Sequence, residues 1–82
     1  MDNQTRDKIL KAITSEFDSF DATSFSEGLR LGDIPGWDSM SSINLQMALE
    51  TEFAVELKDV SLVDSDTIAT IVRLLGDHGV NV

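Results

Sequence analysis

The chain of 82 residues contains no cysteine, a single proline and few basic side chains. Without cysteine, disulfide bonds and thiolate metal sites are excluded. Six lysine and arginine residues stand against fifteen aspartate and glutamate residues, which gives a net charge of -9. A field of this sign repels nucleic acid and anionic membranes and attracts basic protein surfaces. We therefore expect protein partners with positively charged surfaces, and neither nucleic acid nor a membrane as a partner.

Long apolar runs are absent too. No stretch approaches the roughly 20 apolar residues that span a bilayer, and the segment from Met1 to Asp7 lacks the basic and then apolar pattern of a signal peptide. Hydrophobic residues nevertheless make up 41% of the chain, at spacings that favour folding. We expect residues 1–82 to form one small domain, monomeric and cytoplasmic, without a wide catalytic cleft.

The spacing of apolar residues predicts an all-α fold with three main helices and no strand. The helices are expected over residues 3–17, over residues 39–53 and from residue 66 or 67 onward. Gly76 and Gly79 are the expected stop signals of the last helix. Residues 57–62 are expected to form one further short helix or a turn. The resulting architecture is a bundle of three main helices and one short one.

A connection of about twenty residues separates the first two helices, long against the usual ~4–6. Its apolar side chains are expected to hold it to the core, and they are Phe20, Phe25, Leu29, Leu31 and Ile34. The expected core itself consists of Ile13, Phe17, Leu45, Leu49, Phe53, Ile68, Ile71, Val72 and Leu75. A loop this long in so small a domain indicates a role beyond joining two helices.

The second helix has two apolar stripes when it is projected at about 100° per residue. One stripe consists of Leu45, Leu49 and Phe53, and the other consists of Met40, Ile43 and Met47. A small bundle can bury the first stripe fully and the second only in part. Ile43, at the edge of its stripe, is expected to turn inward when it is considered alone. The two methionines are flexible and polarisable, so together they favour an adaptable contact surface.

Ser39 lies where this helix is expected to begin, and Asp38 or Ser39 is the expected N-cap. The pair alone is explained by capping. The site has a second property, because the positive end of a helix macrodipole favours an attached phosphate. An exposed serine hydroxyl at this position is suited to carry a phosphodiester.

The segment around Ser39 resembles the signature of the acyl carrier protein family. The resemblance starts with the triplet Asp38-Ser39-Met40, continues with Ile43 and Leu45, and closes with Leu49-Glu50. The run from Glu52 to Leu57 resembles the acidic-Phe-x-x-Glu-Ile segment that ends the same helix in the family. Thr67-Ile68 matches the start of the family's last helix. The resemblance therefore covers nearly the whole chain.

The resemblance implies a discrete carrier that catalyses nothing itself. Ser39 would receive 4'-phosphopantetheine from coenzyme A through a phosphopantetheinyl transferase, with Asp38 helping to dock that enzyme. The thiol of the arm would hold an acyl or aminoacyl group as a thioester. Further partners would be an acyl- or aminoacyl-loading enzyme and downstream transferases or synthases. The candidate surface for these partners consists of Met40, Ile43, Asn44, Met47 and Glu50.

The sequence also departs from carriers of ordinary fatty acid synthesis, whose second helix is markedly acidic. Ser41, Asn44 and Thr51 occupy positions that are often acidic in the family. Trp37 before Asp-Ser resembles carriers of specialised pathways, although an aromatic that holds the loop explains it equally. We expect a polyketide, modified fatty acid or related pathway, with an aminoacyl or peptidyl carrier loaded by an adenylating enzyme as the alternative.

Other features predict no catalytic or metal site. His78 is the only histidine and is expected to be inert in a frayed C-terminal segment. Asp59, Asp64 and Asp66 lack the glycine and bidentate glutamate of a calcium loop. No Ser/His/acid set suggests an enzyme. The alternative from another class is an acidic helical interaction module without a prosthetic group, in which Ser39 is only a cap.

Overall fold

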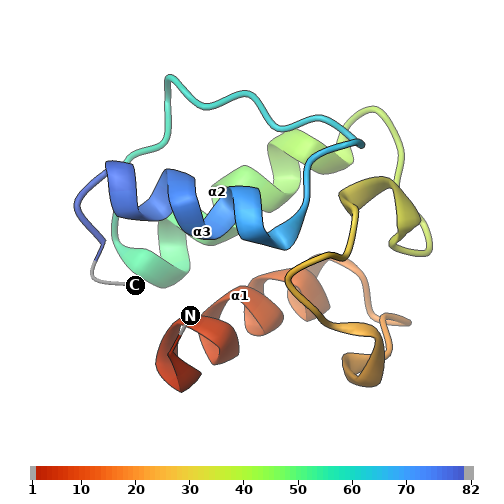
Figure 1. Ribbon diagram of the computed structural model, residues 1–82. Helices are drawn as coiled ribbons and strands as arrows, with labels where there is room; N and C mark the ends of the chain where they lie inside the picture. Colours follow the sequence, from red (N-terminus) through yellow and green to blue (C-terminus); the bar gives the residue numbers. More distant parts are fainter. Residues whose placement is uncertain (1, 81–82) are drawn as a thin grey trace.

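The computed structural model describes residues 2–80 and shows an all-helical fold (Figure 1). The elements in chain order are α1 (Asn3–Glu16), η1 (Ala22–Ser24), η2 (Leu31–Asp33), α2 (Ser41–Phe53) and α3 (Ile68–Asp77). Within residues 2–80 there is no strand, and a single antiparallel bridge joins Arg30 to Thr67. Among these residues, no helix is both long and apolar enough to cross a membrane. The predicted all-α class with three main helices is confirmed.

Helix α1 forms as its sequence predicts and packs against α2. Asp2 caps it by accepting a hydrogen bond of 2.7 Å from the Thr5 amide. Two lysines tie it to the end of α2. The Lys8 ammonium lies 5.5 Å from the centroid of the Phe53 ring, and Lys11 Nζ lies 3.8 Å from Glu52 Oε1. The basic groups of α1 thus join two helices of the fold.

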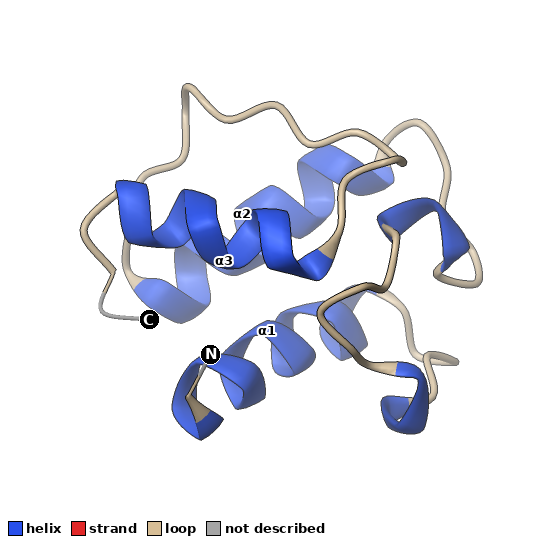
Figure 2. Ribbon diagram, in the orientation of Figure 1, coloured by secondary structure: helices blue, strands red, loops and turns tan. Residues whose placement is uncertain are grey.

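Helix α2 begins at Ser41, two residues after the predicted start at Ser39. Residues 38–41 form a turn of their own before the helix, and the Asp38 side chain caps that turn rather than α2 itself. The helix ends at Phe53 because Ala54 adopts a left-handed conformation, with φ 51°. Of the short helix or turn expected at residues 57–62, the structure has the turn and not the helix. The additional short helices lie in the long α1–α2 loop (Figure 2).

Helix α3 is capped by Thr67, whose hydroxyl accepts a hydrogen bond from the Thr70 amide. The helix passes through Gly76, so the stop signal predicted there is wrong. Gly79 provides the reversal instead, with φ +90°. A glycine ends a helix where its backbone takes a left-handed conformation, and only the second of these two glycines does so.

The core lies between the three helices and extends into both connections. Seven of the nine predicted core residues are buried, whereas Phe53 and Val72 are only partly buried at the edge. Three of the loop residues expected to reach the core, Phe20, Leu31 and Ile34, are buried, and the other two are partly buried. The core members not predicted as core are Ile9, Ala12, Leu57 and Leu62.

Backbone hydrogen bonds hold the long loop against the segment before α3. The Leu31 amide donates to the Asp66 carbonyl and the Gly32 amide to the Asp64 carbonyl, both at 2.9 Å. A Cβ on Gly32 would lie 2.9 Å from the Asp64 Cβ, so only glycine permits this approach without a shift. These contacts hold residues 62–64 next to the turn that contains Ser39.

Candidate functional site

Ser39 is exposed in the middle of the turn 38–41, at the amino end of α2. The hydrogen bonds that form the turn belong to its neighbours. The Met40 amide donates to Asp38 Oδ1 at 2.9 Å, and the Ser41 amide donates to the Asp38 carbonyl at 3.1 Å. The turn therefore uses Asp38 and Ser41 for its own structure and leaves the Ser39 hydroxyl at the surface.

Ser41 completes this turn in a way that the sequence reasoning missed. Its hydroxyl donates to Asp38 Oδ1 at 3.1 Å and accepts a hydrogen bond of 2.9 Å from the Asp38 amide. The bond from the Asp38 amide to the Ser41 side chain corresponds to one half of a capping box, whereas the Ser41 amide donates to the Asp38 carbonyl instead of the Asp38 side chain. The Asp-x-x-Ser spacing was the signal that could have revealed it.

Aromatic stacking anchors the approach to the turn. The rings of Trp37 and Phe17 lie 5.8 Å apart between centroids at an angle of 24°. Gly36 adopts φ +88° immediately before Trp37, and the Trp37 amide donates to the Ile34 carbonyl. The structure therefore bears out the interpretation of Trp37 as an aromatic that holds the loop. The Ser39 turn is attached to the end of α1 as well as to α2.

An open hollow of about 460 Å³ lies beside the Ser39 hydroxyl. It is lined by Trp37, Asp38, Ser39, Ser42, Leu62, Val63 and Asp64. A second hollow of about 390 Å³ lies on the other side of the turn, and Asp38 lines both. A primary hydroxyl that is exposed and flanked by open space fits a bulky phosphodiester substituent, because the substituent can extend without displacing packed side chains.

The outward face of α2 carries exposed apolar side chains. The exposed fractions are 56% for Met40, 50% for Ile43 and 59% for Met47. The expectation that Ile43 turns inward is wrong. At 100° per residue its side chain points about 140° from the midpoint between Leu45 and Leu49, where α2 faces the core. Asn44 is also exposed on this face, so four of the five predicted surface residues lie together.

Glu50, the fifth, has a structural role that the sequence did not predict. Its carboxylate accepts a hydrogen bond of 2.9 Å from the Leu57 amide. One turn earlier, the Gln46 side-chain amide donates to the Leu57 carbonyl at 2.6 Å. Both polar atoms of the Leu57 backbone are thus held by α2. Glu50 lies at the edge of the outward face and helps fix the α2–α3 connection.

His78 lies at the opposite end of the molecule and is not frayed, contrary to expectation. Its Nδ1 is 2.8 Å from the Leu74 carbonyl oxygen, and its Nε2 is 2.8 Å from Asp59 Oδ1. Both partners are acceptors, so this geometry suits the doubly protonated ring. The hydrogen bond to Asp59, followed by that to Leu74, raises the pKa of His78 above its ordinary value of 6.5. The residue ties the end of α3 to the α2–α3 connection.

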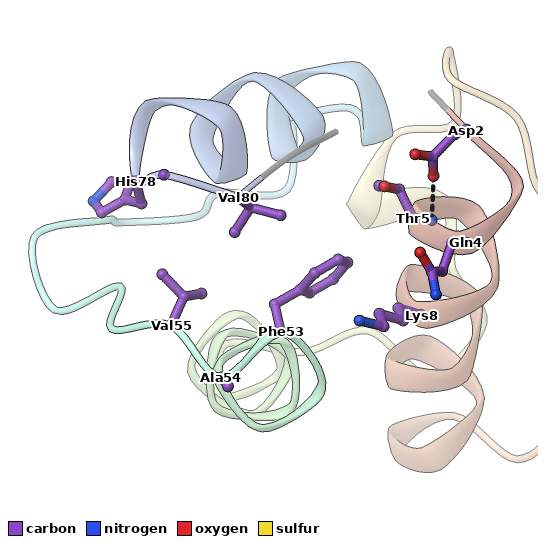
Figure 3. A pocket seen from close by; sticks show the side chains of 10 residues that line it. Asp2, Gln4, Thr5, Lys8, Phe53, Ala54, Val55, His78 and Val80 are labelled. Carbon is purple, nitrogen blue, oxygen red and sulfur yellow. Dashed lines mark hydrogen bonds between the residues drawn. The ribbon is translucent and has the colours of Figure 1, made fainter.

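A hollow of about 400 Å³ lies at this end, between the start of α1, the end of α2 and the residues after α3 (Figure 3). Three of the polar side chains that line it have partners within the fold. Asp2 accepts the Thr5 amide, Lys8 lies over the Phe53 ring, and His78 is paired as described. Within residues 2–80, no group of three acidic, histidine or cysteine side chains could hold a metal ion. Asp2, Lys8 and His78 thus contribute to the packing of the chain ends.

Comparison with known protein families matches residues 36–75 to the family model described as a phosphopantetheine attachment site. Comparisons with curated proteins and with solved structures gave no match. The matched segment contains the Ser39 turn, all of α2 and most of α3. Domains of this family are non-catalytic carriers of covalently bound 4'-phosphopantetheine, and they interact with phosphopantetheinyl transferases and acyl-handling enzymes. In this matched segment, which spans 40 of the 82 residues, the chain is similar to phosphopantetheine-binding carrier proteins, and its all-helical fold is consistent with that similarity.

Proposed function

We propose that Ser39 is the residue to which 4'-phosphopantetheine is attached. The observation that carries this proposal is the exposure of Ser39 in a turn that is held by the Asp38 amide, Asp38 Oδ1, the Met40 amide and the Ser41 hydroxyl, none of which belongs to Ser39. In the transfer, Ser39 Oγ forms a bond to the phosphorus next to the pantetheine of coenzyme A. The bond from that phosphorus to the adenosine bisphosphate portion breaks, and the hydroxyl proton passes to a base or to water. Once attached, the group supplies a thiol that holds the cargo as a thioester.

Asp38 takes the second role at this site, that of docking the transferase. Its Oδ1 is occupied by the turn, whereas its Oδ2 takes part in none of the turn's hydrogen bonds. The Asp38 side chain is exposed next to Ser39. A cationic side chain of the transferase can therefore pair with Oδ2 without disturbing the turn.

The outward face of α2 is proposed as the docking surface for loading and downstream enzymes. Met40, Ile43 and Met47 supply the apolar contact, Asn44 lies among them, and Glu50 flanks them. No exposed residue of α2 on this face is acidic. Docking should therefore depend on apolar burial more than on charge, with the overall charge of -9 steering a basic partner from a distance.

We further propose that residues 1–82 form one acyl carrier domain of a specialised pathway, such as a polyketide or modified fatty acid pathway. Support for one domain comes from the core, which extends from Ile9 in α1 to Leu75 in α3. Support for a specialised pathway comes from the outward face of α2, where the one acidic residue, Glu50 at its edge, is half-buried and bonded to the Leu57 amide. Loading assays with an acyltransferase and with an adenylating enzyme distinguish an acyl carrier from an aminoacyl or peptidyl carrier.

Incubation with coenzyme A and a phosphopantetheinyl transferase tests the carrier assignment. The chain should gain the mass of one phosphopantetheine, and Ser39→Ala should gain none while keeping its helical content. Because the chain has no cysteine, a thiol reagent should find no reactive group before modification and one afterwards. An unmodified wild-type chain would favour the acidic interaction module instead.

A further inference from the structure

The buried hydroxyl of Ser41 is the most constrained polar group near Ser39. Ser41 is 4% exposed, whereas Ser39 is exposed and Ser42 is half-buried. The Ser41 hydroxyl both donates and accepts, and both bonds go to Asp38. The two residues therefore hold one another through a closed pair of hydrogen bonds that spans Ser39.

This pair determines how the Asp38 carboxylate is oriented. Oδ1 accepts from both the Met40 amide and the Ser41 hydroxyl, at 2.9 and 3.1 Å. With that oxygen held by two donors, the carboxylate cannot rotate freely, and Oδ2 keeps a fixed direction relative to Ser39. Without the Ser41 hydroxyl, Oδ1 keeps one donor, and the Asp38 amide loses the acceptor that it has in this turn.

We propose that Ser41 is a positioning residue for the modification of Ser39. It presents the Ser39 hydroxyl and Asp38 Oδ2 to the transferase in one fixed arrangement. The inference rests on the proposed attachment at Ser39. Misplacement of a reacting group by about 1 Å can reduce a rate by 10²-fold. Loosening a two-bond contact without removing the turn should have a smaller effect, of about tenfold.

The first test compares modification rates of the apo chain and three variants. Ser41→Ala should lower kcat/KM for transfer of the arm by about tenfold, which corresponds to about 1.4 kcal/mol of activation free energy. Ser41→Thr keeps the hydroxyl and should stay within about threefold of the wild type. Ser65→Ala is the control, because this exposed serine lies in the α2–α3 connection, outside the turn and outside both hollows beside it, and its rate should be unchanged. Equal rates for Ser41→Ala and the wild type would overturn the proposal.

A double-mutant cycle shows whether Ser41 acts through Asp38. In an Asp38→Ala background, Ser41→Ala should cause no further loss of rate, because the group that it positions is gone. Independent losses that multiply would mean that Ser41 acts by general destabilisation, and this result would also overturn the proposal. The cycle remains informative if Ser41→Thr folds poorly.

Amide hydrogen exchange supplies a readout that does not depend on the transferase. The amides of Asp38 and Met40 should exchange about tenfold faster in Ser41→Ala, while the Leu49 amide in the middle of α2 keeps its protection. An unchanged exchange rate of the Asp38 amide would contradict the inference that the Ser41 hydroxyl holds this amide in the turn. If the wild-type chain were modified at another residue or not at all, the proposal that Ser39 is the attachment site would fail, and the role of Ser41 in its modification would fail with it. Hydrogen exchange could then still show that Ser41 orders the turn, so the two failures are distinguishable.

Discussion

The two faces of α2 carry similar apolar side chains but differ sharply in burial. Leu45 and Leu49 on the inward face are fully buried, whereas Met40 and Met47 on the outward face are more than half exposed. The inward face meets α1 and the rest of the core. The outward face begins beside the exposed Ser39 and is covered by no described element. One short helix therefore holds the fold with one side and leaves apolar side chains exposed on the other, the side proposed as the docking surface.

If the outward face is the docking surface as proposed, this difference in burial makes stability and partner binding separable on α2. Buried leucines lose contacts that nothing else replaces when they are truncated. Exposed methionines add little to folding, because their surface is already in water. Substitutions on the two faces should thus change different measured quantities.

The largest effect is expected on the inward face. Leu49→Ala should lower the free energy of unfolding by about 2–5 kcal/mol, because it opens a cavity at a fully buried position. So large a loss is much of the stability of a small domain. Urea denaturation followed by circular dichroism measures it. A loss well under 1 kcal/mol would show that the two faces have been assigned in reverse.

A smaller effect, of a different kind, is expected on the outward face. Met47→Glu should weaken loading by about thirtyfold, corresponding to about 2 kcal/mol of binding energy, while the melting temperature stays nearly constant. Ser61→Glu places the same charge at an exposed position in the α2–α3 connection and serves as the control. Loss of stability in place of binding would break the comparison.

The salt dependence of loading sharpens the same point. Because the outward face relies on apolar contact, moderate salt should reduce loading only moderately. If the protein worked efficiently as a carrier in ordinary fatty acid synthesis, and modest salt abolished that activity, the specialised pathway would be contradicted. The carrier assignment would not.

An effect of about tenfold is expected when the charge of Asp38 is removed. Asp38→Asn keeps an oxygen to accept from Met40 and Ser41 but loses the anionic Oδ2. The KM of the transferase for the carrier should rise by about tenfold, in line with a lost charged hydrogen bond, at unchanged melting temperature. Asp38→Ala is the contrast, because it also removes the cap and should cost a further 0.5–2 kcal/mol of stability, roughly. Equal stability losses for both variants would argue against separate roles for the two oxygens.

The smallest expected effect concerns the pH dependence of stability at the far end of the fold. The pKa of His78 is raised by Asp59 and the Leu74 carbonyl. The stabilisation from this pair is therefore fully present below pH 6.5 or so and is lost as the pH rises through the raised pKa of the folded state. The melting temperatures of wild type and His78→Gln should differ more at about pH 6 than at about pH 9. A difference in melting temperature that did not change with pH would contradict a stabilising interaction between His78 and Asp59. High salt should reduce the effect, because the pair is near solvent.

Sequence period and capping chemistry predicted most of the fold. The positions of Ile13, Leu45 and Leu49 in the core follow from helical spacing, and the burial of Leu31 and Ile34 follows from the need to anchor a long loop. Local signals failed where the backbone conformation decided the outcome. Gly76 and Gly79 are both plausible stops, but only one has the positive φ that ends the helix.

The exposure of Met40 and Met47 was predicted from the sequence, but the local structure around Ser39 was not. Ser39 and Asp38 lie in a turn before α2 rather than at its first residue and its cap. The pairing of Ser41 with Asp38 was not predicted, although the Asp-x-x-Ser spacing is present in the sequence. The ties of Glu50 to Leu57 and of His78 to Asp59 depend on how the α2–α3 connection folds back, and nothing in a single sequence specifies that path.

The most direct test of the central claim is to locate the phosphopantetheine on the modified chain. After treatment with coenzyme A and a transferase, fragmentation of the peptide that contains residues 36–50 separates the three candidate serines. We predict the arm on Ser39 alone, since Ser41 is buried and bonded and Ser42 is half-buried behind the turn. An arm on Ser41 or Ser42 in the wild-type protein would contradict the account.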